Sequence, residues 1–161
     1  MRDKRGFTLI EIMVVLLIIG IVSSVAFLAF GDFGASRKIV VAGEQFSSYV
    51  KLLQQKAILE SNTYGIKIEK DGYETLRLAD GVSWQSLPRT VLFRWHYFPK
   101  DSVVVLNRKP PNSRHAPEII LYPSGDMSEF KLTFGSLTEA NLITITGKHN
   151  GKLILTHEST P

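Results

Sequence analysis

The chain is organised around the stretch Arg5-Gly6-Phe7-Thr8-Leu9-Ile10-Glu11, which joins a short basic head to a long apolar segment. From Phe7 to Phe30, Glu11 is the only charged residue. As an α-helix rising about 1.5 Å per residue, these 24 residues would extend for roughly 36 Å, and a hydrocarbon core is about 30 Å thick. Positive charge before the segment predicts that the N-terminus stays in the cytoplasm and that the rest is exported. We therefore expect residues 7–30 to cross a membrane once.

Glu11 is out of place in such a segment, because even an Asp at the centre of a membrane helix costs about 2.5 kcal/mol. One explanation is that Glu11 lies near the membrane surface, where the N-terminus of the helix favours a negative charge. A second explanation arises if the chain is cut between Gly6 and Phe7. The new α-amine would then lie one helical turn before Glu11 on the same face, so the carboxylate could meet its own ammonium or that of a neighbouring subunit.

The residues from Lys4 to Val15, Lys-Arg-Gly-Phe-Thr-Leu-Ile-Glu-Ile-Met-Val-Val, resemble the class III signal of type IV pilins and type II secretion pseudopilins. The resemblance implies that a prepilin peptidase cleaves after Gly6 and that Phe7 becomes N-methylated. It also implies that the stem packs into a helical filament in which Glu11 neutralises the amine of an adjacent subunit.

Two other export signals fit the sequence less well. Ser24-Val25-Ala26 has the small residues of a signal-peptidase site, but the apolar run before it is too long for a signal-peptide core and contains a Glu. A lipoprotein anchor needs a cysteine, and the chain has none. Without cysteines there are also no disulfides, so the exported domain must rely on its own packing.

The segment Gly31-Asp32-Phe33-Gly34-Ala35-Ser36 marks the exit from the membrane, and its two glycines permit either a break or one loosened helix. Beyond it, apolar residues recur at spacings of three and four, which predicts an amphipathic helix that ends at Ser61-Asn62. The stripe expected to face the domain consists of Ile39, Ala42, Phe46, Tyr49, Val50, Leu53 and Ala57. The predicted organisation is a leader (1–6), a transmembrane part of the helix (7–30), a periplasmic amphipathic part (31–61) and a β-rich domain (62–161).

After Asn62 the apolar period becomes two, and Lys70-Asp71-Gly72 predicts the turn of a β-hairpin over residues 63–78. Residues 107–117 hold three prolines and four basic residues, and we expect them to form an exposed loop. Further strands are expected near 91–95, 103–106, 119–122 and 130–134, and in a closing hairpin of 142–146 with 153–156. The fold class is α+β: a long N-terminal helix packed on a mostly antiparallel, sandwich-like β domain.

The C-terminal half carries a second resemblance. A strand, the turn Tyr122-Pro123-Ser124-Gly125-Asp126, another strand and a closing hairpin ending in Gly151-Lys152-Leu153-Ile154-Leu155 are similar to the H-type minor pseudopilins of type II secretion and their relatives among type IV minor pilins, the GspH/FimT group. Major pseudopilins usually carry a proline in the stem and a calcium-binding loop near the C-terminus. Here the first proline is Pro88 and the tail has no acidic cluster, which favours a minor subunit.

The resemblance implies a structural subunit at or near the tip of the type II secretion pseudopilus, with its stem in the inner membrane and its domain in the periplasm. Its partners would be other minor and major pseudopilins, the prepilin peptidase, the inner-membrane platform of the secretion machine and membrane lipid. The alternative within the same fold is a minor pilin of a type IV pilus, including one that captures DNA for uptake.

Catalytic chemistry is not expected. The chain has no Gly-x-Ser-x-Gly nucleophile elbow and no glycine-rich phosphate loop. None of its histidines stands at metal-ligand spacing from another His or a carboxylate; they are His96, His115, His149 and His157. His96 lies in an aromatic stretch, where we expect a packed or edge-exposed imidazole. We therefore expect no enzymatic activity, no cofactor and no metal.

DNA binding is the strongest rival function, because cations among aromatics can contact phosphates and stack on bases. The candidates are Arg89, Arg94, Lys100, Arg108, Lys109, Arg114 and His115. The formal charge of the chain is +4 and falls to +2 without the leader, which removes three cations and one anion. The last residues, from Gly151 to Pro161, also lack an arginine-rich tail, so we do not expect a nucleic-acid partner.

Overall fold

The structure is a computed structural model that describes residues 8–88, 90, 92–108 and 116–157, without the side chains of residues 26–33. Its chain divides into two compact units, one up to Ala35 and one from Ser36 on. Gly6, Phe7 and the predicted cleavage between them lie outside the described residues. Within the described residues, no helix combines the length and the apolar character that crossing a membrane requires.

One helix, α1 (Leu9–Glu60), supplies both the N-terminal segment and the helical part of the domain. Residues 31–36 are helical, so of the two conformations that their glycines permit, the chain takes the continuous one. The helix ends as expected: Ser61 is left-handed (φ 52°), and the Asn62 N–H donates to the Ala57 carbonyl at 3.2 Å. Such a residue turns the chain out of the helix while the last carbonyls remain hydrogen-bonded.

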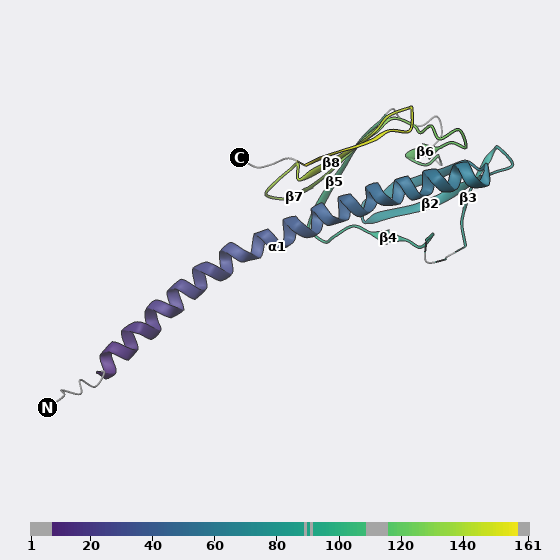
Figure 1. Cartoon of the computed structure of the whole chain (residues 1–161). Coiled ribbons are helices and arrows are strands. Elements are labelled where there is room, and N and C mark those ends of the chain that lie inside the picture. Colours follow the sequence, from purple (N-terminus) through teal and green to yellow (C-terminus); the bar gives the residue numbers. More distant parts are fainter. Residues whose placement is uncertain (1–7, 89, 91, 109–115, 158–161) are drawn as a thin grey trace. The chain divides into compact units, whose positions relative to one another are not determined.

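Two antiparallel sheets form the domain (Figure 1). The first has the order β3-β2-β1-β6, with β4 also paired to β2. Its strands are β1 (Tyr64–Glu69), β2 (Gly72–Ala79), β3 (Ser83–Ser86), β4 (His96–Tyr97) and β6 (Ile119–Leu121). The second has the order β5-β7-β8-β9. Its strands are β5 (Ser102–Arg108), β7 (Phe130–Ser136), β8 (Ile143–Gly147) and β9 (Leu153–His157). The fold class is confirmed, together with the hairpins β1–β2 and β8–β9.

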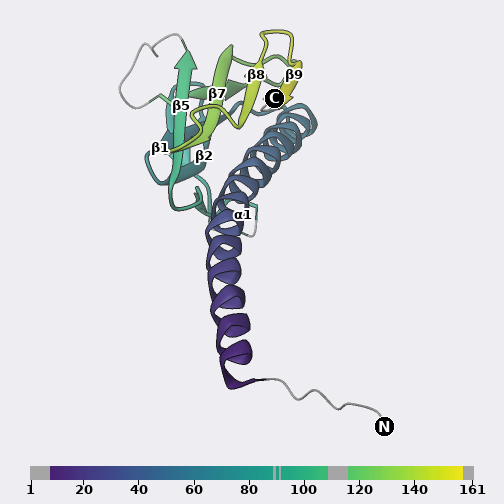
Figure 2. The ribbon, with the colours of Figure 1, turned by 90° about the vertical axis from the view of Figure 1, so that its left-hand side faces the viewer.

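The part of α1 within the domain lies against both sheets (Figures 1 and 2). Phe46 makes this contact: its ring centroid is 4.9 Å from that of Tyr73 on β2 and 6.1 Å from that of Phe134 on β7. The predicted stripe is buried as expected, except that Ala42 is half-buried. Gly43 is also buried, which the pattern did not indicate. A Cβ there would lie 2.6 Å from Ile143 Cγ2, so glycine allows α1 to approach β8.

The strand predicted at 91–95 is wrong, because residues 92–94 bend and the strand begins at His96. β4 pairs with the first two residues of β2, Gly72 and Tyr73. A Cβ on Gly72 would lie 2.1 Å from the His96 carbonyl oxygen. The position of β4 is therefore set by a glycine on another strand, and Val91 lies outside the described residues. The sequence also gave no signal for β3, whose side chains are mostly polar and exposed.

The exposed loop predicted at 107–117 is wrong at both ends. Asn107 and Arg108 belong to β5, paired with Lys131 and Phe130 on β7, and Pro117 is buried. Pro117 packs on Gly65, where a Cβ would come within 2.2 Å of the proline ring. Residues 109–115 lie outside the described residues.

Candidate assembly site

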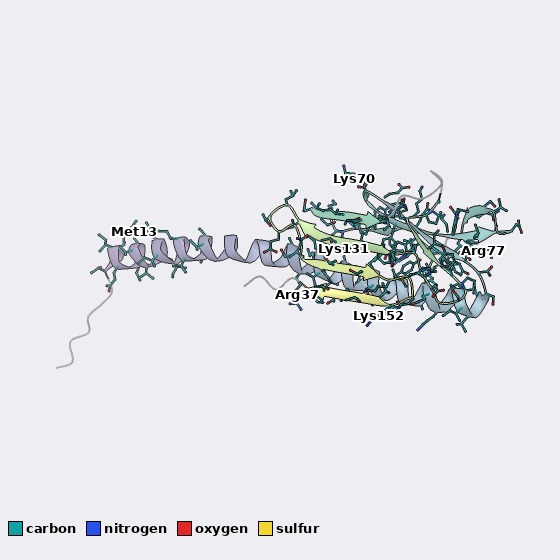
Figure 3. All side chains as sticks on the ribbon, turned by 90° about the horizontal axis from the view of Figure 1, so that it is seen from above. Met13, Arg37, Lys70, Arg77, Lys131 and Lys152 are labelled. Carbon is teal, nitrogen blue, oxygen red and sulfur yellow. The ribbon has the colours of Figure 1, made fainter. Side chains whose placement is uncertain are left out.

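The described residues leave the large apolar side chains of the stem, defined here as Leu9–Val25, exposed. These side chains are between 45% and 79% exposed. Figure 3 shows the side chains around Met13 projecting outward from the helix. Continuous apolar surface of this extent marks a membrane or protein interaction site in a functioning protein.

Thr8 begins the stem helix by capping it. Its Oγ1 accepts a hydrogen bond from the Glu11 N–H at 3.3 Å, and its carbonyl accepts from the N–H groups of Glu11 at 3.1 Å and Ile12 at 3.3 Å. Thr-x-x-Glu at the start of a helix is the capping-box sequence. This role of Thr8 was missed in the sequence analysis, although the four-residue signature was available to find it.

Glu11 lies in the first turn of α1, as a consequence of that cap. The unpaired N–H groups of a first turn favour a negative charge, by about 0.3–1 kcal/mol at an exposed site. Among the described residues, no cation lies within ion-pair distance of its carboxylate. The position is compatible with a partner beyond the chain, and pairing with an ammonium at Phe7 stays a prediction.

Of the seven basic residues considered for DNA binding, the structure describes three, Arg94, Lys100 and Arg108. Arg108 Nη2 donates to Glu118 Oε1 at 3.2 Å, and Glu118 Oε2 accepts from the Ile68 N–H at 2.8 Å. Arg108 therefore helps to join the two sheets at their corner. Arg94 and Lys100 are exposed. The other four candidates, Arg89, Lys109, Arg114 and His115, lie outside the described residues.

His96 is half-buried and its ring packs on the core residue Tyr73, one of the two positions expected for it, whereas the neighbouring Tyr97 is 79% exposed. The His96 ring stacks on Tyr73, with centroids 4.9 Å apart and an interplanar angle of 7°. The Tyr49 hydroxyl bonds the Thr75 hydroxyl and donates to the Leu92 carbonyl at 3.2 Å. Burial raises the pKa of both Tyr49 and Tyr73, so both phenols stay neutral and structural. Within the described residues, no three His, Asp or Glu side chains come together to hold a metal ion.

The fold and the N-terminal signal are shared with known proteins. The minor pseudopilin EpsH from the type II secretion system of Vibrio cholerae superposes with a TM-score of 0.64 at 18% identity, over 77% of this chain and 99% of that chain. A crystal structure of EpsH from the same system gives a TM-score of 0.66 at 17% identity, over 78% of this chain and 98% of that one. Residues 1–27 match the prokaryotic N-terminal methylation motif. In its fold and its N-terminal motif, this chain resembles the type IV pilin-like proteins.

The sequence is also similar to the H proteins of type II secretion. It is 29% identical to type II secretion system protein H of Pseudomonas aeruginosa, over 82% of this chain and 83% of the relative. It is 25% identical to the protein of the same name from Aeromonas hydrophila, over 96% of both chains. The resemblance of the pilin-like chain to the H-type group is thereby confirmed.

Proposed function

We propose that the chain is a minor pseudopilin of the type II secretion system, a structural subunit at or near the tip of the periplasmic pseudopilus that supports export of folded proteins. The observation that carries this proposal is an uncovered apolar stem with one carboxylate in its first turn, on a chain whose domain has the EpsH fold. The H proteins found as relatives support the same function. The chain contributes interfaces rather than catalysis.

The stem would contact membrane lipid before assembly and the stems of other subunits after it. Before assembly, the stem, whose side chains are uncovered in the single chain, lies in the inner membrane with the basic head on the cytoplasmic side and the domain in the periplasm. During assembly the same side chains exchange lipid for the stems of other minor and major pseudopilins. Apolar packing favours the two environments about equally, so Glu11 provides the interaction that distinguishes a neighbouring stem from lipid.

Deleting the chain tests this function directly. We expect the deletion strain to retain its type II substrates in the periplasm and the full-length chain to restore their export. The chain should be recovered from membranes together with other pseudopilins. Normal export without the chain, under conditions in which the secretion machine is expressed, would contradict the proposal.

Processing at Gly6 is a separate prediction. A glycine lets the chain enter a peptidase site in an extended form, where a Cβ would crowd the scissile bond. Gly6→Val should leave the full-length precursor in the membrane, whereas the wild-type chain should begin with methylated Phe7. Mass spectrometry of the purified chain measures both. A wild-type chain that begins at Met1 or Phe27 would contradict the pilin-type signal.

Nucleic-acid binding is expected to be weak. Arg108 is engaged by Glu118, and the exported part is only slightly basic, so few phosphate contacts are available. We expect the domain from Ser36 onward to bind duplex DNA no more tightly than the micromolar range typical of non-specific binding at physiological salt. Fluorescence anisotropy over a salt series measures this. Nanomolar affinity that is lost with Lys109→Ala and Arg114→Ala would instead favour a DNA-capturing minor pilin.

A further inference from the structure

The second sheet has two edges, β9 and β5, and the described residues differ in how they cover them. β9 lies beside α1 (Figure 2), where Glu44 Oε1 is 3.7 Å from His157 Nε2. Gln54 Nε2 on α1 also donates to the Gly151 carbonyl at 3.0 Å, just before β9 begins. At the other edge, β5 pairs with β7 alone among the strands that the structure describes. About half of the backbone N–H and C=O groups of such a strand point away from its neighbour.

The open edge of β5 lacks the features by which natural proteins block unwanted pairing. Edge strands are usually short, bulged, or interrupted by proline or lysine. β5 has seven residues and pairs with β7 in unbroken register. From Ser102 to Asn107 it contains no charged residue, no proline and no glycine. The edge strand β3 of the other sheet differs, since it has four residues that are mostly polar and exposed.

Two of the three outward side chains of β5, those of Val103 and Val105, are apolar, and the third is that of Asn107. Val103 is 38% exposed and Val105 is 56% exposed, whereas Val104 and Leu106 pack against the core. Val105 lies opposite Thr133 on β7, and the Thr133 hydroxyl is 3.1 Å from that of Thr144 on β8. The outer surface beside the edge therefore carries two partly exposed valines and threonine hydroxyls, with exposed Lys131 opposite Asn107 toward its end.

We propose that β5 is a docking strand to which an edge strand of a neighbouring pseudopilin adds, so that the second sheet continues into that subunit. This inference rests on the proposed function, because the stem would bring domains of pilin-like subunits side by side. Backbone hydrogen bonds supply the contact, and the uncovered valines select uncharged, β-branched residues. Lys131 on β7 lies opposite Asn107. We therefore expect the added strand to carry a carboxylate just beyond its end beside Asn107, where it can pair with the lysine.

A protein strand fits this edge better than lipid does. A row of unpaired N–H and C=O groups is satisfied in full by another extended backbone, and lipid tails offer no partner for it. A second copy of this chain also has an extended backbone to offer. The experiment is therefore designed to separate a neighbouring pseudopilin from a second copy.

The experiment places a photocrosslinking amino acid at Val105 of the full-length chain in the membrane of a secreting strain. We expect an adduct that mass spectrometry identifies as a different pseudopilin. Val103→Lys should lower the yield of this adduct about tenfold, because the interface would bury an uncompensated charge. Val103→Thr keeps a β-branched, uncharged side chain and should retain the adduct. Val82→Lys, at an 85% exposed valine before β3, is the matched control and should have no effect.

The outcomes distinguish this inference from the proposed function. An adduct made only of two copies of the chain, or an adduct unaffected by Val103→Lys, would overturn the docking strand. If the Val103→Lys variant exports substrates normally while the Glu11→Ala variant does not, the docking strand is also overturned. The proposed function is then unaffected. Normal export in the deletion strain would instead reject the function itself. Urea unfolding of Val103→Lys serves as the folding control, and a wild-type midpoint is expected because the side chain at this position is partly exposed.

Discussion

Glu11→Ala is expected to remove the chain from assembled pseudopilin complexes while leaving it in the membrane. Deleting a charge from the apolar stem favours insertion, and the predicted cut lies five residues upstream of Glu11. If the carboxylate pairs with an ammonium at Phe7 of a neighbouring subunit, its loss leaves that charge buried and uncompensated. Breaking a buried pair in this way costs about 3–5 kcal/mol. Pull-down of the other pseudopilins and export of substrates measure the effect.

A matched variant separates the charge of Glu11 from its shape. Glu11→Gln keeps the length of the side chain and its hydrogen-bonding capacity but removes the charge. We expect it to fail in assembly nearly as severely as Glu11→Ala, because an amide does not neutralise an ammonium. Domain contacts in the periplasm can retain part of the chain in the complex. If both variants co-purify with the other pseudopilins and export substrates at wild-type levels, Glu11 has no role in assembly. Its charge would then interact only with the dipole at the first turn of α1.

Local patterns predicted the parts of the fold that short-range physics determines. The spacing of Ile39, Phe46 and Leu53 predicted the buried face of α1, because a helix places such residues on one side. The alternation of Tyr64, Ile66 and their neighbours predicted β1, and Asn150-Gly151 predicted the turn before β9, where Gly151 has a φ of 76°. For the candidate assembly site, the apolar run predicted a membrane-spanning segment at residues 7–30. The structure shows the side chains of Leu9–Val25 exposed, but none of its described helices meets the criteria of a membrane span.

The remaining features depend on contacts between residues far apart in the sequence. The position of β4 follows from the missing Cβ of Gly72, and the approach of α1 to β8 follows from that of Gly43. Arg108 was predicted to lie in an exposed loop, whereas in the fold it lies beside Glu118 and pairs with it. A single sequence read in short windows has no information on such pairs. The edge position of β5 could not be predicted for the same reason, because the order of strands in a sheet depends on contacts between strands.

Phe46→Ala is expected to destabilise the domain more than any exposed substitution in α1. Phe46 is fully buried and its ring contacts both sheets, through Tyr73 and Phe134. Truncation removes those contacts and leaves a cavity that the helix and two sheets must all move to close, at a typical cost of about 3–5 kcal/mol. Domains of this size are stable by about 5–15 kcal/mol, so the loss is a large share of the total.

Urea unfolding of the domain from Ser36 onward measures this loss, because the buried core lies between Ile39 and Ile145, within that unit. Leu52→Ala is the matched control on the same helix. Leu52 is 46% exposed, and its truncation should change the free energy of unfolding by about 0.5 kcal/mol or less. Similar losses for both variants would mean that α1 is held by its whole surface. A loss confined to Phe46→Ala would instead show that one aromatic side chain holds the two sheets against the helix, which keeps the edge of β5 in a fixed position relative to α1.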